Sequence, residues 1–152
     1  MTLCRLLLMW PSVLDVLENI FNDGSSDDNC GVSLSLISKM ESYEFVFILH
    51  LMKTLLGMTN VLSQALQRKD QDIIGAVNLI ESVQSDLQKY RETGWEGLLE
   101  EVNTFCEDNM IPLINMDDIM PSVGHSRRKC RQDRVTNSHH YRVEIFCQVC
   151  FQ

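Results

Sequence analysis

The residues best suited to bind a metal lie near the C-terminus of this chain. Cys147 and Cys150 form a Cys-x-x-Cys pair, with His139 and His140 upstream and Cys130 before them. A zinc site needs four such ligands arranged as a tetrahedron. Here the pair falls inside a predicted helix, and no second Cys-x-x-Cys accompanies it. A chance pair of helix cysteines is the better interpretation, so we predict neither a metal site nor a cofactor.

Carboxylates and a histidine are the residues that could support acid–base catalysis. Three adjacent pairs occur, at Asp27–Asp28, Glu100–Glu101 and Asp117–Asp118. Such pairs are usually solvated, and nothing in the sequence gives one of them a general-acid role. His50 lies in an apolar stretch and could act as a lone base, but a buried histidine with one hydrogen bond is far more common. Gly-rich phosphate loops, GxSxG and HExxH are absent from the sequence. We therefore predict no catalytic residue and no enzyme activity.

A basic cluster is the one feature that could bind nucleic acid. It consists of Arg127, Arg128, Lys129, Arg131 and Arg134. Residues 121–152 carry a net charge of +4, whereas residues 1–120 hold 19 acidic and 7 basic side chains, a net charge of −12. An acidic body repels phosphates, so any binding is expected to be weak and without sequence preference. A solvated loop is the preferred interpretation of the cluster, and a nuclear-import signal and a phosphate-binding patch are the alternatives.

The cysteines and the apolar segments bear on the compartment. The six cysteines are irregularly spaced and predict free thiols in a reducing compartment, either nuclear or cytoplasmic. A secreted helical protein with disulfides is the rival interpretation. The apolar run at Leu6–Met9 is too short for a signal peptide. The stretch Phe45–Met58, interrupted by His50 and Lys53, is too short to span a bilayer, so we predict no membrane contact.

The spacing of apolar residues predicts an all-α protein, because these residues recur every three or four positions. We expect an irregular bundle of about five helices, near residues 11–21, 32–66, 71–92, 94–108 and 138–150. The segment 109–137 contains two prolines and the basic cluster, and is expected to be disordered or loop-like. No run of alternating apolar and polar residues is long enough to predict a sheet.

Local signals refine this prediction at three places. The polar segment Asn22–Gly31 is expected to be a loop, and the long helix 32–66 to bend near Glu41–Ser42. From Phe45 onward that helix is apolar on most sides and should be central. Gly94 is expected to end a helix in the left-handed conformation, and Thr93 and Glu96 to form the capping box of the next one. A turn this short predicts that the helices 71–92 and 94–108 are antiparallel neighbours.

Two long runs of residues resemble one known family. The run from Ser35 to Glu107 is similar to the helical region of the hAT-type transposase-derived proteins, of the zinc finger MYM-type-like (plant type) group. The segment TNSHHYRVEIFCQV, Thr136 to Val149, resembles a short helix of the same family. Trp10 matches the tryptophan with which that helical region begins, although Met9 replaces the usual arginine. The resemblance covers about residues 10–150.

The resemblance implies an RNase H-like core in which three carboxylates bind divalent metal for phosphodiester chemistry. This chain resembles only the helical insertion that interrupts such a core. The first two carboxylates would precede Trp10 and the third would follow Gln152, so none is carried over. Glu144 is not assigned to that role. Residues 1–9 match no part of the family pattern.

The expected organisation follows from these observations. Residues 1–9 form an atypical extension, 10–108 the helical domain, 109–137 an exposed linker with the basic cluster, and 138–152 a C-terminal helix. We expect a non-catalytic, truncated fragment of a domesticated or degenerate hAT-like transposase, at most a protein-interaction scaffold that binds partners through exposed helix faces. The alternative is a weak, non-specific nucleic-acid-binding module that uses the basic tail. The oligomeric state is left open.

Overall fold

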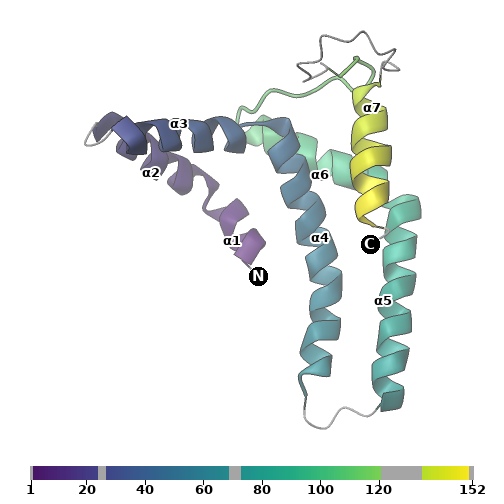
Figure 1. The fold of residues 1–152 in the computed structure, drawn as a ribbon. Helices are drawn as coiled ribbons and strands as arrows, with labels where there is room; N and C mark the ends of the chain where they lie inside the picture. Colours follow the sequence, from purple (N-terminus) through teal and green to yellow (C-terminus); the bar gives the residue numbers. More distant parts are fainter. Residues whose placement is uncertain (1, 24–26, 69–72, 121–134, 151–152) are drawn as a thin grey trace, which may run out of the picture. The chain divides into compact units, whose positions relative to one another are not determined.

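The computed structural model describes residues 2–23, 27–68, 73–120 and 135–150. The all-α prediction is confirmed for these residues, in which the only β-pairing is an isolated bridge between Ile119 and Thr136. The helices are α1 (Thr2–Leu8), α2 (Trp10–Asp23), α3 (Asp27–Met40), α4 (Tyr43–Leu66), α5 (Ile73–Thr93), α6 (Trp95–Asp108) and α7 (Asn137–His139), followed by the π-helix η1 (His140–Cys147) (Figure 1). The expected number of about five helices was too low.

Two differences at the N-terminal end account for most of the extra helices. No helix was predicted for residues 1–9, which were expected only to be an atypical extension, but α1 forms there and packs on α4. The predicted helix 32–66 is two helices, because Ser42 ends one and starts the next. Its side chain accepts a hydrogen bond from the Phe45 amide at 3.3 Å and thereby caps α4.

The loop predicted for Asn22–Gly31 was wrong over most of its length. Helix α2 continues to Asp23 and α3 already begins at Asp27, so the two helices form a tight hairpin. The Cys30 thiol donates a hydrogen bond to the Phe21 carbonyl at 3.4 Å and links the two helices near the turn. Polar composition misled the prediction because exposed helix faces are polar too.

Helix α4 is central, as predicted, and contacts α1, α3, α5 and α6. Its most deeply buried residues, Val46, Phe47 and Leu51, lie against the other helices. Ile48 and Leu56 of the same helix are equally apolar but exposed. A helix that is apolar on most sides has no periodic signal that identifies its buried face.

Helix α4 is also the one described helix that is long and apolar enough to cross a bilayer. The expectation that this segment is too short to span rested on Phe45–Met58, but α4 has 24 residues. Its seven buried residues pack within the protein, and the central helix of a soluble core passes the same test of length and composition. The absence of membrane contact stays a prediction.

Helix α6 follows α5 after a sharp turn at Gly94, and the details of that turn differ from the prediction. Gly94 has φ −82° and ψ −9°, an ordinary right-handed conformation, and no side chain caps α6. A Cβ atom added to Gly94 would lie 2.5 Å from the Tyr90 carbonyl oxygen, so the close approach of the backbone requires glycine here. Helices α4 and α5 form an antiparallel pair (Figure 1). Helix α6 crosses α4 (Figure 1), and α6 contacts α4 more extensively than it contacts α5.

The end of α6 has the hydrogen bonds of a Schellman motif. The Ile111 amide donates to the Cys106 carbonyl at 2.8 Å, and the Met110 amide to the Glu107 carbonyl at 3.2 Å. Met110 has φ 57°, the left-handed conformation that costs a residue with a side chain about 1 kcal/mol. Ile111 is buried and anchors the chain beyond the helix.

Replacing Met110 with glycine is therefore expected to raise the free energy of unfolding by about 0.5–1 kcal/mol, because glycine adopts a positive φ without strain. The Met110 side chain is exposed, so little packing is lost. Urea unfolding followed by circular dichroism measures the effect. Met110→Ala keeps the strain and serves as the control without gain. A loss of stability in the glycine variant would contradict the assignment.

The chain divides into two compact units, Met1–Leu113 and Ile114–Gln152. In the second unit the buried Asn137 side chain donates to the Asn115 carbonyl at 2.8 Å, and Thr136 caps α7. Residues 109–120 form no helix, as expected, while residues 121–134 lie outside the described part. The predicted helix 138–150 is largely π-helical, a form with wider hydrogen-bonded turns than an α-helix.

Candidate functional site

A polar cluster between α4 and α6 is the most chemically distinctive group in the first unit. Glu101 of α6 lies opposite two α4 side chains one turn apart: the Lys53 ammonium donates to Glu101 Oε2 at 2.9 Å, and His50 Nδ1 lies 3.4 Å from the same oxygen. The histidine ring is buried, whereas the glutamate is half exposed. The ring also packs edge-on against Phe105, with 5.3 Å between centroids.

The environment of the cluster sets its charges. Burial lowers the pKa of His50 and outweighs the opposing effect of the hydrogen bond that His50 donates to Glu101. The hydrogen bond from Lys53 holds the pKa of Glu101 below its ordinary value. At neutral pH the cluster is therefore an ammonium–carboxylate pair beside a neutral imidazole.

A hollow of about 620 Å³ borders this cluster. It is lined by His50, Lys53, Gly97, Glu100, Glu101, Thr104, Phe105 and Asp108. Thr104 carries the one hydroxyl in this lining, and that hydroxyl donates to the Glu100 carbonyl at 2.8 Å. It is therefore not paired with His50, and the lining holds no activated nucleophile of the serine–histidine kind. The structure shows the commoner arrangement for His50, a buried ring with one hydrogen bond.

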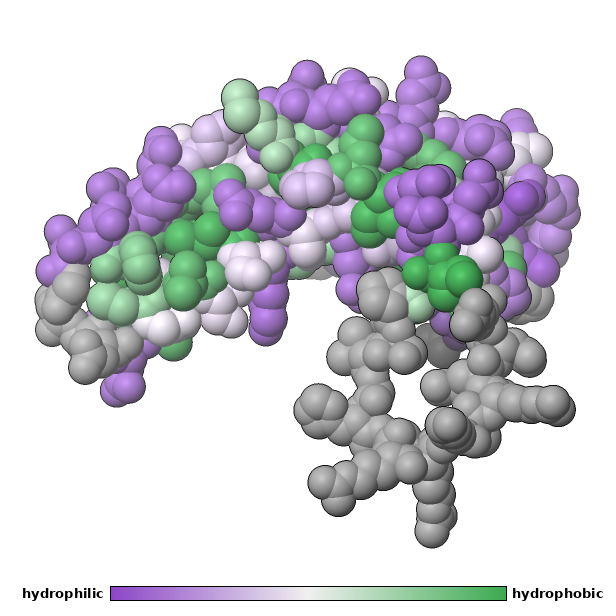
Figure 2. Space-filling view, turned by 90° about the horizontal axis from the view of Figure 1, so that it is seen from above, coloured by the Kyte–Doolittle hydropathy of each residue, from purple (hydrophilic) through white to green (hydrophobic). Residues whose placement is uncertain are grey.

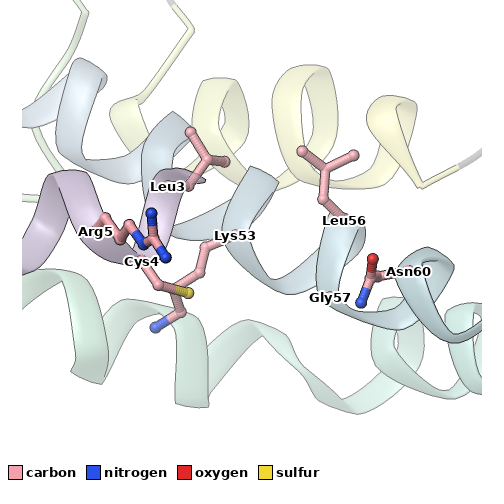
Figure 3. Close-up of a pocket in the computed structure, with 7 residues that line it drawn as sticks. All are labelled: Leu3, Cys4, Arg5, Lys53, Leu56, Gly57 and Asn60. Carbon is pink, nitrogen blue, oxygen red and sulfur yellow. The ribbon is translucent and has the colours of Figure 1, made fainter. Parts of the chain in front are cut away.

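A second hollow, of about 540 Å³, lies between α1 and α4 (Figure 3). Helix α1 contributes Leu3, Cys4 and Arg5, and α4 contributes Lys53, Leu56, Gly57 and Asn60. Lys53 thus borders both hollows. The exposed Cys4 has no histidine among the residues of this lining, so the second hollow also offers no nucleophile–base pair.

The predicted nucleic-acid contacts, Arg127, Arg128, Lys129, Arg131 and Arg134, all lie outside the described residues. Their role stays a prediction. The same holds for Cys130, the upstream member of the considered zinc set.

The other candidate zinc ligands, which the structure describes, do not form a cluster. His140 Nδ1 lies 2.6 Å from Glu144 Oε2, an i, i+4 pair on η1. Within the part of the chain that the structure describes, no group of three metal-binding side chains converges. Of the paired carboxylates, Glu101 belongs to the polar cluster and Asp118 accepts a hydrogen bond from the Asn115 side chain at 3.2 Å.

No family model matches the chain, and no solved structure matches it. The resemblance to the hAT-type transposase-derived proteins consequently stays a prediction.

The lowered pKa of His50 has a consequence for stability. Below about pH 6.5 the unfolded chain binds a proton at His50 that the folded chain resists, so acidification favours unfolding. We expect His50→Leu to remove this dependence, which is at most about 1.4 kcal/mol per pH unit below pH 6.5. Urea unfolding at several pH values measures it. His139→Gln, at an exposed position, should behave like the parent protein, and an unchanged slope in His50→Leu would contradict the assignment.

Proposed function

We propose that this chain is a non-catalytic helical region of a hAT-type transposase-derived protein and serves as a scaffold for protein contact. The resemblance of Ser35–Glu107 to that family's helical insertion supports the origin. The observation that carries the interaction role is the number of large apolar side chains left exposed on helix faces. Isolated exposed apolar residues are ordinary, but groups of them mark interaction surfaces.

These exposed apolar residues form two groups. One lies on the α2–α3 hairpin and includes Val16, Ile20, Phe21, Val32, Leu34 and Leu36. The other lies toward the joined ends of α4 and α5 and includes Val61, Leu66, Ile73, Ile74, Val77 and Ile80. Figure 2 shows hydrophobic side chains gathered along the hairpin and bordered by hydrophilic ones. In both groups these large apolar side chains are open to solvent.

Quantitative affinity purification tests the proposal. Wild-type protein is compared with Val32→Gln/Leu36→Gln and with Val77→Gln/Ile80→Gln, one pair for each group. We expect wild-type protein to recover at least one partner that one of the two variants fails to recover. Wild-type protein and that partner, each purified, are then expected to bind when they are mixed. Identical recovery by all three proteins would contradict a scaffold role for these faces.

The non-catalytic part of the proposal has a separate test. Supercoiled plasmid incubated with the protein and Mg²⁺ or Mn²⁺ is expected to remain intact, because none of the family's three metal-binding carboxylates can be assigned in this chain. Nicking that survives purification and disappears on replacing one particular acidic residue of this chain would overturn it.

A further inference from the structure

The α2–α3 hairpin offers a more specific inference, which rests on the proposed scaffold function. Two hollows border α3: one of about 390 Å³ between the helices, and one of about 450 Å³ on the neighbouring face of α3. Leu17 and Ile20 of α2 line the first, and Val32 and Leu36 of α3 line both. Val32 and Leu36, one turn apart and both exposed, therefore form a ridge with a hollow on either side.

A ridge of i, i+4 side chains beside a groove is the surface onto which another helix packs. Helices α2 and α3 have 14 residues each, a length of roughly 21 Å at 1.5 Å per residue. A partner helix of about four turns would match this length. The groove between α2 and α3 is open to solvent. A third helix packed in it would bury the apolar side chains of both α2 and α3.

The charge of the hairpin selects the kind of helix. Between Trp10 and Met40 the sequence holds five acidic residues and a single basic one, Lys39. Asp23 lines the groove at the turn end of the hairpin, and Asp28 and Lys39 line the neighbouring hollow. Like charges across an interface are unfavourable, so an acidic partner is disfavoured and a basic one is attracted.

We propose that the groove between α2 and α3 binds an amphipathic helix of a partner protein, with an apolar stripe seated on Val32 and Leu36 and lysine or arginine residues along its edges. Recognition of this type places apolar side chains at positions i, i+3, i+4 and i+7 of the bound helix. The apolar stripe supplies affinity, and the basic edges supply preference over acidic helices.

Synthetic peptides of 16 residues test the inference against the full-length chain. The probe has leucines at i, i+3, i+4 and i+7 and lysines elsewhere; a second peptide has glutamate in place of lysine, and a third has the lysine composition with a scrambled order. Fluorescence anisotropy at low salt is expected to show at least tenfold tighter binding of the ordered lysine peptide than of either control peptide. The preference over glutamate should shrink as salt rises, because exposed charges are screened.

Substitution locates the site. Val32→Gln/Leu36→Gln is expected to weaken binding of the ordered lysine peptide at least tenfold, and Val143→Gln/Val149→Gln, an exposed apolar pair outside both groups, to leave it unchanged. All four positions are exposed, and circular dichroism verifies that each variant folds. Equal binding of the lysine and glutamate peptides, or binding that is insensitive to the α3 pair, would overturn the inference. If the peptides do not bind as expected while recovery of a natural partner depends on the α5 pair, the inference is wrong and the proposed scaffold function stands. If no variant changes partner recovery, the proposed scaffold function itself is wrong.

Discussion

Replacing Trp10 with alanine is expected to lower the free energy of unfolding by about 3–5 kcal/mol, the range for removing a fully buried aromatic side chain. Trp10 is the first residue of α2 and is 1% exposed. Its ring lies 6.0 Å from the Phe45 ring of α4 and 5.2 Å, edge-on, from the Phe105 ring of α6, measured between centroids. One side chain therefore joins three helices. Urea unfolding followed by circular dichroism measures the loss.

A second substitution at Trp10 separates packing from hydrogen bonding. The indole N–H is buried and has no hydrogen-bond partner among the described residues. Trp10→Phe removes this unsatisfied donor, which partly offsets the smaller ring, so we expect a loss well below that of alanine. A loss under 1 kcal/mol in Trp10→Ala would show that α2 is not anchored through this residue.

Replacing Gly94 with alanine is expected to cost about 3 kcal/mol, at the upper end of the range for overpacking. The added Cβ would meet the Tyr90 ring and lie 2.5 Å from the Tyr90 carbonyl oxygen. A side chain can rotate away, but a backbone oxygen at the end of α5 moves only if the helix moves. Urea unfolding measures the change, and the relative orientation of α5 and α6 is expected to shift with it.

Gly97 provides the matched control for this prediction. It lies three residues further along, within α6, and an added Cβ there meets nothing within 4 Å. Gly97→Ala should stabilise the protein by about 0.5–1 kcal/mol, because alanine is the better helix former. Equal effects of the two substitutions would mean that the turn at Gly94 tolerates a side chain.

The sequence was most informative where a helix is amphipathic. The spacing of apolar residues puts Trp95, Leu98 and Val102 on one face of α6, and all three are buried. In α5 the same spacing puts Ile73, Val77 and Val83 on one apolar face, yet Ile73 and Val77 are exposed and Val83 is buried. Periodicity shows which side of a helix is apolar, whereas the length that is buried depends on where other helices pack.

The polar cluster shows a different limit of sequence reasoning. His50 and Lys53 were visible as interruptions of an apolar run, but Glu101 follows them by about fifty residues, with no local signal that connects them. Their meeting depends on α6 crossing α4 (Figure 1), whereas the short turn at Gly94 had predicted α6 as an antiparallel neighbour of α5. A polar residue inside an apolar helix therefore indicated that a partner exists without identifying it.

The central claim is that the exposed helix faces bind protein rather than support chemistry. Titration calorimetry of a partner recovered through these faces, at several temperatures, tests it most directly, because burial of apolar surface gives a negative change in heat capacity on binding. We predict a clearly negative value for wild-type protein and a value closer to zero for the glutamine variant of the face involved. A heat-capacity change near zero, or one that the substitutions leave unaltered, would contradict the claim.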